Sequence, residues 1–271
     1  MIIDFHTHIF PEKIAASTIE VLKANTLKVG GRESEAYTDA TADGLIKSMD
    51  KHGVDYSVVM PIATTVRQSK SINQFAAVIN SMDRLFSFGS LHPMQVDWES
   101  VVYDIKEKGL SGIKLHPEYQ KFYINSPESI RLLKLCERLG LLVTIHAGSD
   151  IGMDPPVHCM PEMLRQVLDY EIEGSNIIAA HMGGWREWDG VMEYLAKTPI
   201  FMDTAYITLD MEKKQFEDIV RAHGADKILF ATDSPWETPG MTVEYINSTS
   251  LSNEEKEKIF SGNAKKLLKI V

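Results

Sequence analysis

Short apolar runs rich in β-branched residues recur along the whole chain, and this repetition limits the folds it can adopt. There are eight such runs: Ile2–Phe5, Tyr56–Ile62, Leu85–Leu91, Gly112–Leu115, Leu141–Ile145, Ile177–Ala180, Ile200–Asp203 and Ile228–Ala231. Most carry apolar residues at consecutive positions, a pattern typical of strands that are covered on both faces, as in a parallel sheet. The runs are therefore predicted to be strands of a parallel sheet.

Segments with the spacing of an amphipathic helix lie between these runs and stop at glycines. The predicted helices are Asp43–His52, Trp98–Lys108, Ser129–Leu139 and Glu212–His223. A glycine just past a helix end is the usual left-handed cap. Strand, helix, glycine and strand repeating in this order predict right-handed crossovers. Eight such units favour an α/β fold of the (β/α)8 TIM-barrel type, while an open two-lobed sheet stays the alternative because sequence does not show closure.

The domain organisation follows from length and from the lack of a linker. The chain has 271 residues, which is long for one average domain but usual for one barrel. No Gly/Ser-rich, Pro-rich or single-charge block separates two halves. We therefore expect residues 1–271 to form a single TIM-barrel domain. The one irregular stretch, Asn25–Ala40, follows the first strand and is a candidate lid or pocket wall, or else an ordinary surface excursion.

Charge and composition exclude several classes of partner. The chain carries 28 Lys and Arg against 38 Asp and Glu, a formal net charge of −10. An acidic surface repels nucleic-acid phosphates and anionic membranes. No apolar stretch approaches the roughly 20 residues that cross a bilayer, and the first residues lack the pattern of a secretory signal. With only 2 cysteines and no CxxC pair, the sequence indicates a soluble, cytoplasmic protein without nucleic-acid or membrane partners.

Ligand-type side chains follow several of the predicted strands. His6 and His8 come after the first strand, and in extended backbone such alternate residues point the same way. Two neutral imidazoles side by side suit a divalent transition metal, zinc above all, although an HxH pair alone is a weak signal. Further polar residues end other strands, namely Lys114, His116, His146, His181 and Asp233. In a barrel all these strand ends meet on one face, so together they predict a metal site.

Rival catalytic motifs are absent from the sequence. There is no GxSxG elbow of a serine hydrolase, no GxxxxGK[ST] phosphate loop and no GxGxxG after a strand. Phosphoryl transfer and nicotinamide chemistry therefore lose support.

The combination of motifs resembles the amidohydrolase superfamily. It is similar, more narrowly, to the amidohydrolase-related branch that includes aminocarboxymuconate semialdehyde decarboxylase and related aromatic-acid decarboxylases. The motifs that carry this resemblance are DFHTH, GIKLHP, HAG, AHMGG, TDSP and the closing GNAKKLL, which span Ile3 to Leu268. The resemblance supports the barrel and the metal. Members of the branch both hydrolyse and decarboxylate, so the reaction stays open.

The resemblance also implies roles for individual residues. His6, His8, His146 and Asp233 would be the metal ligands, and His181 a catalytic base or an orienting group. The metal would be one Zn²⁺ with a water completing the site, and another divalent ion such as Mn²⁺ is the alternative. Such a cation lowers the pKa of bound water from about 15.7 towards about 7. Asp233 could then accept the proton of the water, which makes it catalytic as well as a ligand.

Substrate contacts are expected from three further residues. Lys114 is near the place where binuclear superfamily members carry a carboxylated lysine, so a second metal stays an alternative to the one-metal type. Its plainer role is to pair with a substrate carboxylate or an acidic neighbour. Trp185 and Arg186 could supply a stacking surface and a carboxylate clamp, which suggests an acidic substrate.

Three functions remain open at this point. The first is a metal-dependent hydrolase that acts on a small molecule through a metal-activated water. The second is a metal-dependent non-oxidative decarboxylase of a small unsaturated or aromatic carboxylic acid. The third, of another class, is a non-catalytic metal-binding scaffold or sensor. The extra proton-transfer group His181 favours catalysis, and the family resemblance implies a homodimer.

Overall fold

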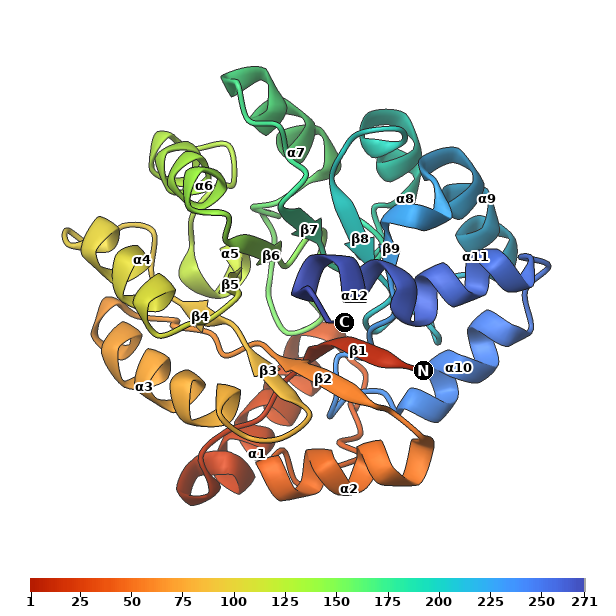
Figure 1. Ribbon diagram of the computed structural model, residues 1–271, viewed down its shortest axis with the longest axis horizontal. Coiled ribbons are helices and arrows are strands. Elements are labelled where there is room, and N and C mark those ends of the chain that lie inside the picture. The colour runs from red at the N-terminus through yellow and green to blue at the C-terminus, as the bar shows by residue number, and fades with distance from the viewer. Residues whose placement is uncertain (271) are drawn as a thin grey trace.

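A closed barrel of parallel strands forms the centre of the computed structural model, which describes residues 1–270 (Figure 1). The third predicted strand is interrupted at Phe88 and therefore carries two labels, β3 and β4. The strands of the barrel are β1 (Ile3–Thr7), β2 (Tyr56–Val59), β3 (Leu85–Ser87), β4 (Gly89–Ser90), β5 (Gly112–Leu115), β6 (Leu142–Ile145), β7 (Ile177–Ala179), β8 (Phe201–Asp203) and β9 (Ile228–Leu229). All paired neighbours run parallel, in the orders β1-β2-β3 and β4-β5-β6-β7-β8-β9. The eight predicted strands are confirmed.

Two seams close the barrel. At the first, the N–H of Phe88, which lies between β3 and β4 in the chain, donates to Val59 O on β2 over 2.9 Å and so connects the two sheets. At the second, β1 meets the end of β9, where the N–H of Phe5 donates to Phe230 O and the N–H of Asp233 donates to His6 O, both over 2.9 Å. The fold is therefore a TIM barrel, and the open sheet is excluded.

Helices surround the barrel and cross between its strands. They are α1 (Glu12–Gly30), α2 (Ala42–His52), α3 (Ser69–Asn80), α4 (Trp98–Glu107), α5 (Pro117–Gln120), α6 (Pro127–Leu139), α7 (Pro161–Val167), α8 (Trp188–Gly190), α9 (Lys213–His223), α10 (Pro239–Asn247), α11 (Asn253–Glu257) and α12 (Asn263–Leu268). None of the helices within residues 1–270 is long and apolar enough to cross a membrane.

The four predicted helices appear with small shifts at their ends. Helix α6 begins two residues earlier than predicted, because Ser126 accepts a hydrogen bond from the Ser129 N–H and Pro127 occupies the first helical position. Gly53 and Gly140 end α2 and α6 in the left-handed conformation, with φ of 71° and 64°. Gly224 also follows α9, but with φ of 107° and ψ of 123° it does not form the left-handed cap that was predicted.

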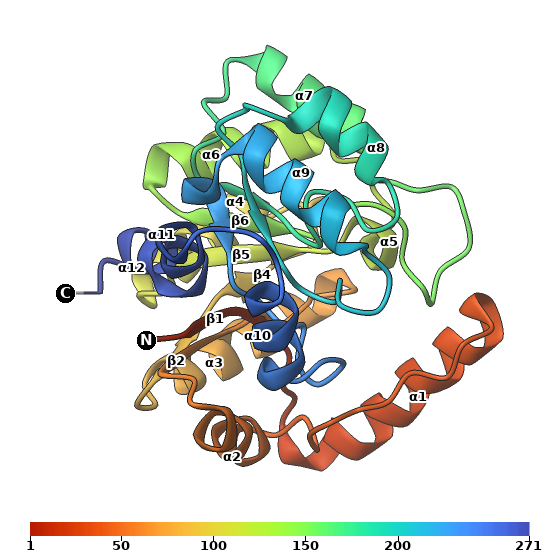
Figure 2. The ribbon, with the colours of Figure 1, turned by 90° about the vertical axis from the view of Figure 1, so that its right-hand side faces the viewer.

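The structure corrects the prediction that Asn25–Ala40 is irregular throughout. Residues 25–30 are the last part of α1, and only the segment from Gly31 to Thr41 is irregular. Asn and Thr cost less than about 1 kcal/mol each in a helix that is already formed, so the helix continues to Gly31, which takes the left-handed cap with φ of 64°. Figure 2 shows α1 projecting beyond one end of the barrel, apart from the ring of other helices.

The N-terminal part of the barrel interior is an apolar core. Side chains of the strands fill it, among them Phe5, Phe88 and Ile178, and Ala264 and Leu268 of α12 pack into the same cluster. Figure 1 shows α12 close to both chain ends, and it contacts β1 and β9. Helix α12 thus closes the N-terminal end of the barrel, and a ligand can enter only at the C-terminal ends of the strands.

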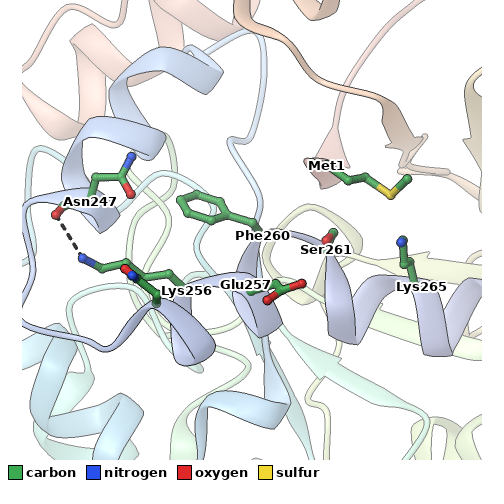
Figure 3. Close-up of a pocket in the computed structure, with 8 residues that line it drawn as sticks. Met1, Asn247, Lys256, Glu257, Phe260, Ser261 and Lys265 are labelled. Carbon is green, nitrogen blue, oxygen red and sulfur yellow. Dashed lines mark hydrogen bonds between the residues drawn. The ribbon is translucent and has the colours of Figure 1, made fainter.

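A small hollow lies near the N-terminal end of the barrel, and its lysine Lys256 has a structural role. The hollow measures about 420 Å³ and is lined by Met1, Phe260 and polar side chains of α10 to α12 (Figure 3). The Nζ of Lys256 donates to the carbonyls of Asn247 and Thr249 over 3.0 Å each. The lysine therefore satisfies carbonyls at the end of α10, an arrangement that stabilises a helix terminus.

Candidate metal centre

A cavity of about 880 Å³ opens at the C-terminal ends of the strands. Its lining includes the polar residues that the sequence places after strands: His6, His8, Lys114, His116, His146, His181 and Asp233. The predicted convergence of the strand ends is thus observed.

His6, His8 and Asp233 form the tightest cluster in this cavity. His8 Nε2 lies 3.0 Å from Asp233 Oδ1, and His6 Nε2 lies 3.4 Å from the same oxygen. The two Nε2 atoms are 3.2 Å apart. These distances bring two imidazole nitrogens and one carboxylate oxygen to a common point, which is a donor set for a divalent metal.

The tautomers of the two histidines make this point electron-rich. Lys114 Nζ lies 2.9 Å from His6 Nε2 and can only donate, so this Nε2 accepts and the His6 Nδ1–H faces Asp203 Oδ2 over 2.9 Å. His8 Nδ1 lies 2.8 Å from Met60 O, which can only accept, so in the neutral ring Nε2 carries the lone pair. Two lone pairs and a carboxylate oxygen therefore face one another. A cation removes this repulsion, so the residues fit a metal.

Burial and neighbouring charge set the protonation of the cluster. Burial, helped by the Lys114 charge, lowers the pKa of His6 well below its usual value. Burial alone would raise the pKa of Asp233, but the adjacent imidazoles of His8 and His6, when either ring carries an extra proton, hold it well below its usual value. A neutral imidazole and an ionised carboxylate are the forms that bind metals.

His146, the fourth expected ligand, lies beside His181. His146 Nδ1 is 3.0 Å from His181 Nε2, while its Nε2 is 3.2 Å from Ser149 O. His181 Nδ1 lies 2.8 Å from Ala205 O. Because both carbonyls accept, the two facing nitrogens carry lone pairs in the neutral rings, and one proton between them would form a hydrogen bond. The pair is thus suited to hold a proton or to bind a cation.

A second group of potential ligands includes His146 again. His116 Nε2 lies 3.4 Å and His146 Nε2 3.8 Å from Asp150 Oδ2. The rings of His116 and His146 stack with 4.1 Å between centroids, and Tyr119 stacks on the other side of His116 at 3.8 Å. The structure therefore groups three of the four expected ligands and places His146 in a neighbouring cluster.

Lys114 is buried against the group of possible ligands His6, His8 and Asp233, which is called the metal cluster below. Its Nζ contacts the imidazole of His6, and no carboxylate lies within ion-pair distance of it among the described residues. Burial lowers its pKa to about 8, against the opposing charges of Asp203, Asp233 and Asp150. The side chain reaches the cavity, where it could also meet a substrate carboxylate.

Trp185 and Arg186 occupy different environments. Trp185 is buried and lines the cavity, and its ring Nε1–H has no hydrogen-bond partner among residues 1–270. Arg186 lies outside the cavity lining: its guanidinium stacks over Trp185 at 4.1 Å and bonds Asp210 over 2.8 Å, with 51% of its side chain exposed. A stacking role suits the position of Trp185, and the carboxylate clamp of Arg186 stays a prediction.

Sequence reasoning did not single out Asp203 and Tyr119. Asp203 ends β8, and its Oδ1 accepts from the His181 and Ala205 N–H groups while Oδ2 faces His6. The rule that selected the other strand ends would have found it, because it closes the predicted strand Ile200–Asp203. Tyr119 lies on the short helix α5, and no periodic signal points to it.

The fold and the cluster together define a TIM barrel with a histidine–carboxylate centre at the C-terminal ends of its strands. The family described as Amidohydrolase matches residues 3–270. The chain belongs to this family and is an enzyme.

Two curated proteins that are similar to part of the chain are named gamma-resorcylate decarboxylases. A gamma-resorcylate decarboxylase from Polaromonas sp. (strain JS666) is 30% identical over 136 residues, which cover 44% of this chain and 41% of the relative. The match thus spans about two fifths of that relative.

Two solved structures share the whole fold. A 2,6-dihydroxybenzoate decarboxylase complexed with 2,6-dihydroxybenzoate has a TM-score of 0.71 at 17% identity, with 99% of each chain covered. A dihydroxybenzoic acid decarboxylase from Polaromonas sp. JS666, with bound manganese and 2-nitroresorcinol, has a TM-score of 0.67 at 16% identity, with 99% and 97% covered.

Proposed function

We propose that the chain is a metal-dependent non-oxidative decarboxylase of a hydroxylated aromatic carboxylic acid. The observation that carries this is the convergence of the His6 and His8 lone pairs with Asp233 Oδ1 at the bottom of a cavity with aromatic walls. The names of the relatives support decarboxylation over the hydrolysis that the sequence put first. Residues 1–271 act as one barrel domain in this proposal.

The metal would be held by His6, His8 and Asp233, with His146 as the predicted fourth ligand. A divalent ion, when bound, would supply positive charge to hold the carboxylate and a neighbouring hydroxyl oxygen of the substrate. The manganese in one relative supports Mn²⁺ as a candidate beside the Zn²⁺ expected from the sequence. Loading the protein with each ion in turn, and measuring metal per chain and turnover, decides between them.

The reaction needs one proton delivered to carbon. The proton adds to the ring carbon that carries the carboxylate, the bond between them breaks, its electron pair returns to the ring and carbon dioxide leaves. His181 is the proposed acid, because the carbonyl of Ala205 holds its Nδ1–H and leaves Nε2 in the cavity as the atom that can carry the transferred proton. The aromatic wall that includes Tyr119 and Trp185 would orient the ring.

The experiment is an assay that separates the two reactions. The metal-loaded protein is given dihydroxybenzoates, hydroxybenzoates, lactones and amides, and both carbon dioxide and acid release are measured. Decarboxylation in D₂O should place one deuterium at the vacated ring carbon. Acid release from lactones or amides, without carbon dioxide from any benzoate, would favour the hydrolase instead.

Variants separate catalysis from metal binding. His181→Asn should keep the metal and lose at least about 100-fold in kcat, because general acid catalysis contributes about that much. Metal binding with no turnover of any substrate would favour a scaffold or sensor. Light scattering would test the homodimer that the resemblance implies.

A further inference from the structure

The cavity is much larger than one aromatic ring requires. It measures about 880 Å³, whereas an engineered cavity of about 150 Å³ accommodates benzene. The metal cluster and the aromatic wall take up only one part of its lining. The remaining lining comes mainly from residues of α1 and α3 and of the loops after β1 and β2.

This remaining part is an apolar groove between two helices. Helix α1 contributes the apolar Ile14, Val21 and Leu22, and α3 contributes Ile72 and Phe75, next to the polar but uncharged Thr18, Asn25, Thr26 and Ser71. Ile14 and Leu22 are eight residues apart, which corresponds to about 12 Å along the helix. Of the lining residues on these two helices, only Lys13 carries a charge. The groove therefore suits an uncharged, elongated apolar group.

Helix α1 lines this groove, and few of its side chains pack into the core of the protein. Of its 19 residues only Ala15, Ile19 and Thr26 are buried, while Val21 is 59% and Ile14 48% exposed. Its C-terminal end rests on the loop after β6, where Gly30 packs so closely on Ile151 that a Cβ would lie 2.5 Å from Ile151 Cγ1. Ile151 also lines the cavity. Helix α1 thus forms one wall of the cavity, and the apolar side chains of Ile14 and Val21 on it remain largely exposed to solvent.

The groove and the metal cluster are parts of one continuous cavity, and this argues for a single ligand that occupies both. Its carboxylate would lie beside Lys114 and the cation that His6, His8 and Asp233 would hold, and its uncharged part would meet α1 and α3. We propose that the substrate is an aromatic carboxylic acid that carries an alkyl chain on its ring, with the chain lying between α1 and α3. The carboxylic acid part rests on the proposed function, and the apolar part rests on the groove.

Binding of unreactive product analogues tests the groove independently of turnover. Resorcinol and its methyl, propyl, pentyl and heptyl derivatives, substituted at position 4 or at position 5, are titrated into the metal-loaded full chain by calorimetry. In the better of the two series, each buried methylene should tighten binding about three- to fourfold. No gain with chain length in either series would overturn the proposal.

Two variants of α1 provide the structural control. Val21→Asp should abolish the gain with chain length and leave the affinity for resorcinol unchanged. Leu27→Asp is the matched control, because Leu27 is 56% exposed on the same helix and is not part of the cavity lining. It should change neither value. Equal effects of the two variants would overturn the proposal.

The remaining outcomes separate this inference from the proposed function and from another occupant. Carbon dioxide release from a dihydroxybenzoate, with no chain-length gain, refutes the groove and keeps the decarboxylase. A chain-length gain that Val21→Asp abolishes, without turnover of any benzoate, keeps the groove and refutes the decarboxylase. If Val21→Asp halves the molar mass in light scattering and leaves the gain intact, the apolar stripe of α1 is a contact between copies of the chain and the proposal is wrong.

Discussion

Glu237 should make the stability of the fold depend on pH. Its carboxyl is buried, and Oε1 accepts from the N–H and the hydroxyl of Thr208 over 3.0 and 2.7 Å. Oε2 has no hydrogen-bond partner in the part of the chain that the structure describes. Burial raises its pKa to about 8 from the usual 4.5, while the bonds from Thr208 oppose the shift and the charges of Asp233 and Asp210 add to it. The protonated form is therefore favoured in the folded chain.

The sign and the size follow from linkage. Between pH 4.5 and 8 the folded chain holds a proton at Glu237 that the unfolded chain has released, so the free energy of unfolding falls as pH rises. The slope is at most about 1.4 kcal/mol per pH unit, or about 4 kcal/mol between pH 5 and pH 8. Glu237→Gln removes the titration, and its amide oxygen can still accept from Thr208.

Urea unfolding of the wild type and of Glu237→Gln across pH 5 to 8 measures this effect. The variant should be close to the wild type at pH 5 and more stable by a few kcal/mol at pH 8. Glu254→Gln is the control, because the hydrogen bond from Lys258 lowers the pKa of the exposed Glu254 carboxyl and keeps its titration below this range. Stability curves that stay parallel for the wild type and Glu237→Gln would refute the reasoning.

Three further predictions concern the metal cluster and the cysteines. His8→Ala should reduce bound metal per chain to background in elemental analysis, because it removes one of three converging donors; wild-type metal content would contradict the assignment. Asp203→Asn should weaken metal binding about 10- to 100-fold in chelator competition, because Asp203 orients His6, and an unchanged affinity would mean that the ring needs no such partner. Neither Cys136 nor Cys159 should react with a thiol reagent before unfolding, because burial raises the pKa of Cys136 to about 12 and that of Cys159 well above its usual value; a rapidly labelled thiol in the native protein would count against this.

The barrel could be predicted because its strands are covered on both faces. A run such as Leu141–Ile145 has to be apolar throughout, and this makes it visible in the sequence. The grouping of His6, His8 and Asp233 follows from the same fact, because strand ends of a barrel meet at one face. Topology alone brings Asp233 to His6 across more than two hundred residues.

Side-chain orientation was beyond the sequence. That His146 turns towards His181 and Ser149 depends on a rotamer and on a loop carbonyl, neither of which has a periodic signature. The contact between Lys114 and His6 likewise depends on how two buried side chains share the barrel interior. The length of α1 was missed because the stop lies at Gly31, and the polar residues before it are tolerated once the helix has formed.

The seam between β1 and β9 sets the order in which the chain can complete its fold. Phe5 bonds Phe230, and Asp4 accepts two hydrogen bonds from Thr232, 228 positions further along the chain. During synthesis, the edge of β1 that pairs with β9 stays unpaired until almost the whole chain has left the ribosome. Pairing between strands so far apart in the sequence forms slowly. Because His6 lies on β1 and Asp233 follows β9, the metal cluster cannot assemble before this last pairing. The ability to bind metal would therefore report that the molecule has finished folding.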